Sequence, residues 1–265
     1  MAIAATVFIG VLTAVQARIN GALGAAIGDG FVAASISFGT GLVLILVITL
    51  SVPSGRLGLR RLVAGAGRGI PIWMLLGGLA GAVTVATQGL TVATIGVALF
   101  TVGLVAGQTA GGLVLDRVGY GPAGVVAVTV PRLVGGLLAI VGVVLCALGQ
   151  RGEPVTWWML ALPLIAGAGI AWQQGTNGRL RQELGSPLST TVVNFTGGSI
   201  ALGIAAAVSV TVNGMPSALP AEPWMYLGGA MGVVYIVISA ALVKRTGVLL
   251  LGLGSVVGLL AASII

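Results

Sequence analysis

The stretch QARINGALG, residues 16–24, ends the first apolar run of the chain with a Gln and an Asn four residues apart. The stretch QQGTNGRLRQELG, residues 173–185, ends a later apolar run with a Gln and an Asn at the same spacing. Residues four apart lie on one face of an α-helix, so each stretch predicts a helix with two amides on one side. The recurrence indicates that the chain contains two copies of one unit.

Two sequence offsets relate these copies over most of their length. At an offset of 151 residues, WMLLGGLAG (73–81) matches WMYLGGAMG (224–232), and three further glycines match beyond them. At an offset of 157, the paired residues are Gln16, Asn20, Gly21, Leu23, Gly28, Phe38 and Gly41 with Gln173, Asn177, Gly178, Leu180, Gly185, Phe195 and Gly198. We therefore predict a first repeat over residues 1–149 and a second over residues 150–265.

The composition is that of an integral membrane protein. Hydrophobic residues make up 57% of the 265 residues and charged residues only 6%, with a mean hydropathy of +1.16. Soluble domains carry about 25% charged residues. The basic residues behind the sequence pI of 11.1 are scattered at the ends of apolar runs, so no basic face for nucleic acid is expected. Cys146 is alone, which excludes a disulfide framework.

The apolar runs predict an all-α, polytopic fold. Helices of about 20 residues cross a bilayer, and runs such as GLVLILVITL (41–50) lack the alternation of membrane β-strands. The predicted transmembrane helices cover 2–22, 31–51, 71–91, 95–115, 131–149, 157–177, 188–212, 224–243 and 246–265.

The distribution of basic residues predicts an N-terminus in the cytoplasm. With that orientation, only Arg18 and Arg151 fall on the outside. The other basic residues fall on the inside, as the positive-inside rule requires. They are Arg56, Arg60, Arg61, Arg68, Arg117, Arg132, Arg179, Arg181, Lys244 and Arg245.

An odd number of helices in the first repeat means that the second must enter the membrane from the opposite side. We therefore expect inverted five-helix repeats, an architecture typical of secondary transporters. Helix 131–149 has no counterpart in the second repeat, where four helices are present. We expect the intact gene product to continue past Ile265 into a tenth helix.

Several motifs resemble the YdcZ branch of the drug/metabolite transporter superfamily. They are the two Gln-x-x-x-Asn helix ends, SFGTG (37–41), NFTGG (194–198) and VAGQTAGGLVLDRVG (105–119). The resemblance implies a bacterial inner-membrane exporter built from five-helix units, and it implies no particular substrate. Small multidrug exporters of that superfamily use a Glu in the first helix, where this chain has Gln16.

Polar side chains within the apolar runs are the candidates for a substrate cavity, because such groups face a cavity or another helix rather than lipid. We expect a cavity between helices 2–22, 71–91, 95–115, 157–177, 224–243 and 246–265. The candidate residues are Gln16, Asn20, Thr84, Gln88, Gln108, Gln173, Asn177, Asn194, Tyr235 and Ser239. Hydrogen bonding between helices without any substrate is the alternative, and the residue pattern leaves it open.

The charges constrain the function. All acids, from Asp29 to Glu222, fall in loops or at helix ends, so no mid-membrane carboxylate carries a proton or attracts a cation. We expect export of a small neutral, zwitterionic or anionic metabolite without a cofactor. A channel or a membrane subunit of a larger complex is the alternative function, and a homodimer stays open. Without His or clustered Asp, no enzyme active site or metal site is expected.

Overall fold

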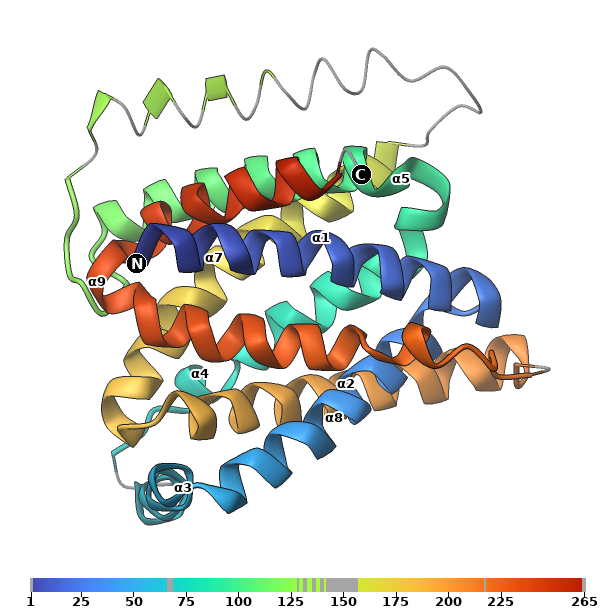
Figure 1. Ribbon diagram of the computed structural model, residues 1–265, viewed down its shortest axis with the longest axis horizontal. Helices are drawn as coiled ribbons and strands as arrows, with labels where there is room; N and C mark the ends of the chain where they lie inside the picture. Colours follow the sequence, from blue (N-terminus) through green and yellow to red (C-terminus); the bar gives the residue numbers. More distant parts are fainter. Residues whose placement is uncertain are drawn as a thin grey trace.

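A computed structural model describes residues 2–65, 69–127, 157–216 and 218–263, together with a few positions between 129 and 141. Every regular element in these residues is a helix, which confirms the all-helical prediction. The predicted helix over 131–149 falls mostly outside the described residues. The elements are α1 (Ala2–Ile27), α2 (Gly30–Ser51), α3 (Pro53–Gly65), α4 (Ile72–Leu75), α5 (Gly77–Arg117), α7 (Trp157–Leu184), α8 (Pro187–Asn213), η1 (Pro223–Tyr226) and α9 (Gly228–Ser263) (Figure 1).

Five helical segments of the described chain are long and apolar enough to cross a membrane. They are Ala4–Ile27, Gly30–Ser51, Ile72–Arg117, Pro187–Asn213 and Pro223–Leu259. Helix α7 has 28 residues, but it is not in this set. Its C-terminal part, QQGTNGRLRQEL, is polar and lowers its hydropathy.

Helices α5 and α9 are each long because two predicted helices follow one another without a loop. The junctions are Gly96, with φ 77° and ψ 160°, and Gly247, with φ 71° and ψ 172°. A positive φ is readily available only to glycine, so each junction interrupts the helix at a residue that tolerates the interruption. The expected boundaries between 71–91 and 95–115 and between 224–243 and 246–265 are thus interruptions inside continuous elements.

The turn between α1 and α2 has the same construction as the turn between α7 and α8. Gly28 and Gly185 have φ values of 75° and 70° and end the preceding helices. The next residue caps the following helix: the Asp29 side chain accepts from the Phe31 and Val32 amides at 2.8 and 3.1 Å. Ser186 accepts from the Ser189 amide at 3.4 Å. These side chains satisfy amides that have no partner within the helix.

Glycines allow two helix pairs to pack with backbone against backbone. Helix α1 lies along α9, and α5 lies along α7 (Figure 1). A Cβ on Gly107 of α5 would collide with the Leu164 carbonyl of α7, and a Cβ on Gly258 of α9 would collide with the Val7 carbonyl of α1. Such close approach is how membrane helices gain van der Waals contact.

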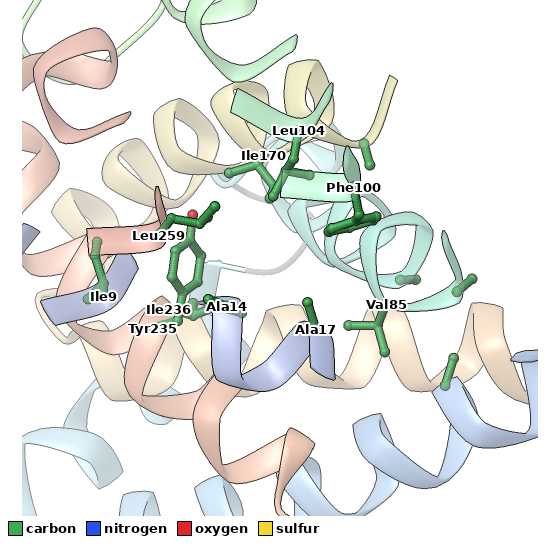
Figure 2. Close-up of a cluster of buried hydrophobic side chains, with 14 of the residues drawn as sticks. Ile9, Ala14, Ala17, Val85, Phe100, Leu104, Ile170, Tyr235, Ile236 and Leu259 are labelled. Atoms are coloured by element: carbon green, nitrogen blue, oxygen red, sulfur yellow. The ribbon is translucent and has the colours of Figure 1, made fainter. Parts of the chain in front are cut away.

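The core lies where these helices meet, and the outer surface is apolar as well. Ile9, Tyr235, Ile236 and Leu259 belong to one cluster of buried side chains (Figure 2). On the outside, Val43 of α2 and Ile200 of α8 are 65% and 61% exposed. Large apolar side chains exposed along whole helices indicate contact with lipid rather than with water.

The chain between the predicted transmembrane helices 31–51 and 71–91 is itself helical over most of its length, as α3. Helix α3 packs through Gly55, whose carbonyl accepts from Ser189 Oγ at 2.9 Å. Gly58, also buried, lies against the side chains of Ser186 and Ser189. The buried glycines are thus the surface through which α3 contacts α8.

Candidate functional site

A small cavity lies at the centre of the helix bundle. Its volume of about 30 Å³ suffices for a water molecule and for little more. Helices α1, α2, α5, α7, α8 and α9 contribute to it. The lining residues are Thr13, Gln16, Phe38, Gly81, Thr84, Val85, Gln88, Ile170, Gln173, Phe195, Gly232, Tyr235 and Ile236.

All lining residues except Gln88 form pairs that obey the two sequence offsets. The offset of 157 pairs Thr13 with Ile170, Gln16 with Gln173, and Phe38 with Phe195. The offset of 151 pairs Gly81 with Gly232, Thr84 with Tyr235, and Val85 with Ile236. Equivalent positions of the two halves therefore meet around one small space.

The two glutamines at the cavity make equivalent contacts across it. Gln16 Nε2 donates to the Gly228 carbonyl at 3.1 Å, and Gln173 Nε2 donates to the Gly77 carbonyl at 3.0 Å. The acceptors are the first residues of α9 and α5. A carbonyl at the first turn of a helix already accepts within that helix, so each glutamine adds a bond that ties two helices together.

Gln88 carries an amide nitrogen that is buried and has no partner. Its side chain is fully buried and lines the cavity, and its Oε1 accepts from Asn20 Nδ2 at 2.7 Å. Its own Nε2 and the Oδ1 of Asn20 have no hydrogen-bond partner in the described part of the chain. An unsatisfied buried amide costs about 1–3 kcal/mol, which a ligand with an acceptor atom would recover.

The second half holds its amides in a fuller network. Asn194 Nδ2 donates to Asn177 Oδ1 at 2.6 Å, and Asn194 Oδ1 accepts from Gln173 Nε2 at 2.9 Å. Ser37 stands at the equivalent position of the first half, and its hydroxyl is unpartnered in the described structure. The asymmetry arises because a serine is too short to bridge two amides.

Two aromatic rings close the cavity from α2 and α8. Phe38 and Phe195 have ring centroids 4.9 Å apart and an interplanar angle of 37°. Each ring lies against a glycine of the facing helix, Phe195 on Gly41 and Phe38 on Gly198. The rings thus belong both to the contact between α2 and α8 and to the wall of the cavity.

The structure brings five of the sequence candidates to the cavity and leaves the other five outside its lining. Those inside are Gln16, Thr84, Gln88, Gln173 and Tyr235. Three asparagines lie outside the lining. Asn20 is hydrogen-bonded to Gln88 and Asn194 to Gln173. Asn177 is hydrogen-bonded to Asn194. Ser239 donates to the Ile236 carbonyl at 3.1 Å, and Gln108 lies beside Gly252 of α9.

Sequence reasoning did not place α2 and α8 among the cavity helices, although Asn194 of α8 was a candidate residue. The expected cavity included residues of 95–115 and 246–265, and none of them lines it. Phe38 and Phe195 line it instead, and a search limited to polar groups passes over them. The sequence signal that could have identified these two residues is their position in the repeated motifs SFGTG and NFTGG. Gln174 was also missed: its Nε2 donates to Tyr235 OH at 2.9 Å.

No charged side chain lines the cavity. The buried carboxylate of Asp116 has a different role. Asp116, 1% exposed, ends α5 and accepts from the amides of Val248 and Leu249 at 3.0 and 3.1 Å. It thereby caps the part of α9 that follows Gly247. The described residues contain no cluster of His, Cys, Asp or Glu that could hold a metal ion.

The apolar spans and the lipid-compatible surface are those of an integral membrane protein, with amide side chains at the centre of its helix bundle. The chain belongs to the family described as "Putative inner membrane exporter, YdcZ", which it matches over residues 1–145 and 158–265. This membership confirms the resemblance noted in the sequence motifs. No curated protein and no solved structure matches the chain significantly.

Proposed function

We propose that the protein exports a small uncharged metabolite by alternating access between two inverted repeats. The observation that carries the proposal is the pairing of equivalent residues around the central cavity. Inverted repeats place a substrate site where the two halves meet near the middle of the membrane.

The small volume of the cavity fits a closed state of such a transporter. A space of about 30 Å³ admits no metabolite until helices move apart. The bonds from Gln16 to Gly228 and from Gln173 to Gly77 are equivalent by sequence and join different helix pairs. We propose that opening toward one side of the membrane breaks one of these bonds while the other holds. A channel, the alternative function, would instead need a continuous water-filled path through the protein from one side of the membrane to the other.

The lining favours a neutral substrate over the charged classes that the sequence left open. Transfer of a charged group to a site without a counter-charge is strongly unfavourable. The unpaired Gln88 nitrogen offers one donor, and Phe38 and Phe195 offer apolar surface. A neutral molecule with a carbonyl or hydroxyl acceptor and an apolar part suits this combination.

A thermal-shift screen followed by a flux assay tests the proposal. We expect neutral metabolites with an acceptor group to raise the melting temperature of the purified protein, and anionic or cationic analogues of equal size to leave it unchanged. The stabilising compounds should then cross proteoliposomes that contain this protein alone. Stabilisation by charged compounds only, or flux that requires an added ATPase, would contradict the proposal.

A second prediction concerns orientation. Arg60, exposed on α3, should lie in the cytoplasm, and Met215, 80% exposed after α8, should lie outside. A Cys at position 215 is therefore expected to react with an impermeant thiol reagent in intact cells. A Cys at position 60 should react only after permeabilisation, and Cys146→Ser provides the background. The reverse labelling pattern would invert the topology.

A further inference from the structure

A second hollow lies at the end of α7, away from the central cavity. Its volume is about 340 Å³, which accommodates a phosphate-bearing headgroup. Arg181, Gln182 and Gly185 line it from the end of α7 and the turn that follows, and Lys244 lines it from α9. Both charged residues of the lining are cations.

These cations lack the partners that would neutralise them. No carboxylate of the described residues forms an ion pair with Arg181 or Lys244, and the Arg181 Nε is buried without a hydrogen-bond partner. A third cation adjoins the hollow: Arg61 of α3 lies against Gly185 and donates from Nη1 to the Leu184 carbonyl at 3.3 Å. Unneutralised cations that converge on one space favour an anion there.

The duplication does not account for this cluster. At the offsets of 157 and 151, the positions equivalent to the lining residues are Gly24, Ala25, Gly28 and Ala93. All four are small and uncharged. The positive-inside rule explains an excess of basic residues on one side, but it requires neither a pocket nor a buried guanidinium nitrogen. The equivalent positions of the first half therefore carry no such cluster of cations.

The exposed residues of helix α3 indicate whether a lipid or a soluble compound supplies the anion. Its glycines Gly55 and Gly58 are buried, while Leu57 and Val63 are 49% and 77% exposed beside its arginines. A short helix with exposed leucine and valine among arginines is suited to the headgroup region of a bilayer. Arg61 of this helix reaches the hollow, so a position of α3 in the headgroup region would bring lipid headgroups to the hollow.

We propose that the hollow formed by Arg181, Gln182, Gly185 and Lys244 binds the phosphate group of an anionic phospholipid. Arg181 and Lys244 supply positive charge in the lining of the hollow, and Arg61 adds positive charge beside it. Basic pockets between membrane helices bind lipid headgroups in this way, with about 1 kcal/mol for each Lys or Arg near the surface. The site is separate from the proposed substrate cavity.

Native mass spectrometry of the full chain with phosphatidylglycerol tests the site. We expect one tightly retained lipid, and an affinity about 30-fold lower in the double variant Arg181→Gln/Lys244→Gln, which loses two such increments. The matched control is Arg56→Gln/Arg60→Gln, which removes the same charge from the exposed arginines of α3 outside the hollow. It should retain the lipid, and phosphatidylcholine should bind none of the three proteins at this site.

Three outcomes would overturn the proposal. Equal loss of lipid in both double variants would show a general charge attraction without a site. Unchanged lipid binding in the Arg181→Gln/Lys244→Gln variant would exclude the hollow. In a lipid-free detergent, a melting-temperature increase with inorganic phosphate that depends on Arg181 and Lys244, without retained phosphatidylglycerol, would assign the site to a soluble phosphate compound.

Discussion

Replacement of Gln88 by Leu is expected to reduce transport about 100-fold, because the variant loses the amide donor of the cavity that has no partner among the described residues. The stability should fall by only about 1 kcal/mol, since Asn20 Nδ2 loses a single acceptor. Initial flux rates in proteoliposomes, measured at equal amounts of folded protein, give the first quantity. The melting temperature gives the second.

Gln108→Leu is the matched control for this variant. Gln108 lies on the same helix, is also buried, and has an Nε2 with no partner among the described residues, but it lies outside the cavity against Gly252. From the sequence we expected both glutamines to contact substrate. The cavity as observed predicts that Gln108→Leu retains transport within a factor of a few. Equal loss of flux in both variants would contradict the assignment of the cavity.

Replacement of Gly107 by Ala is expected to lower the stability by about 3 kcal/mol, or the melting temperature by about 6–12 °C. The added methyl group would overlap the Leu164 carbonyl and reach within 3.0 Å of the Ala168 amide nitrogen. Both obstacles are backbone atoms of α7, so the two helices must move apart. Thermal unfolding of the purified protein, followed by circular dichroism, measures the effect.

Two further variants test the same explanation, one at the equivalent contact and one at a glycine with open space around it. Gly258→Ala is expected to be as harmful, because its methyl group would overlap the Val7 carbonyl at the equivalent contact between α9 and α1. Gly203→Ala, at a helical glycine of α8 with open space around it, should raise the stability slightly through better helix propensity. Unchanged melting in the Gly107→Ala protein would refute the close packing of α5 and α7.

The candidate site was predictable only in part, and the reason is visible in particular residues. Gln16, Gln88 and Gln173 were found because amides in apolar runs stand out. Phe38 and Phe195 were not, because a phenylalanine in an apolar run has no local feature that separates a cavity wall from a lipid contact. Gln108 and Gln88 look alike in sequence, and only the path of α5, which is interrupted at Gly96 between them, places one at the cavity and the other beside α9.

The sequence by itself determined the membrane location, the helical fold and the correspondence between the two halves. These properties follow from the length of the apolar runs and from matching residues, which need no knowledge of contacts. The tertiary structure decided which faces meet: that α3 is a helix packed on α8, that equivalent residues share one cavity, and that Arg181 and Lys244 converge. Such arrangements depend on how closely helix backbones approach, and neighbours far apart in the chain set that distance.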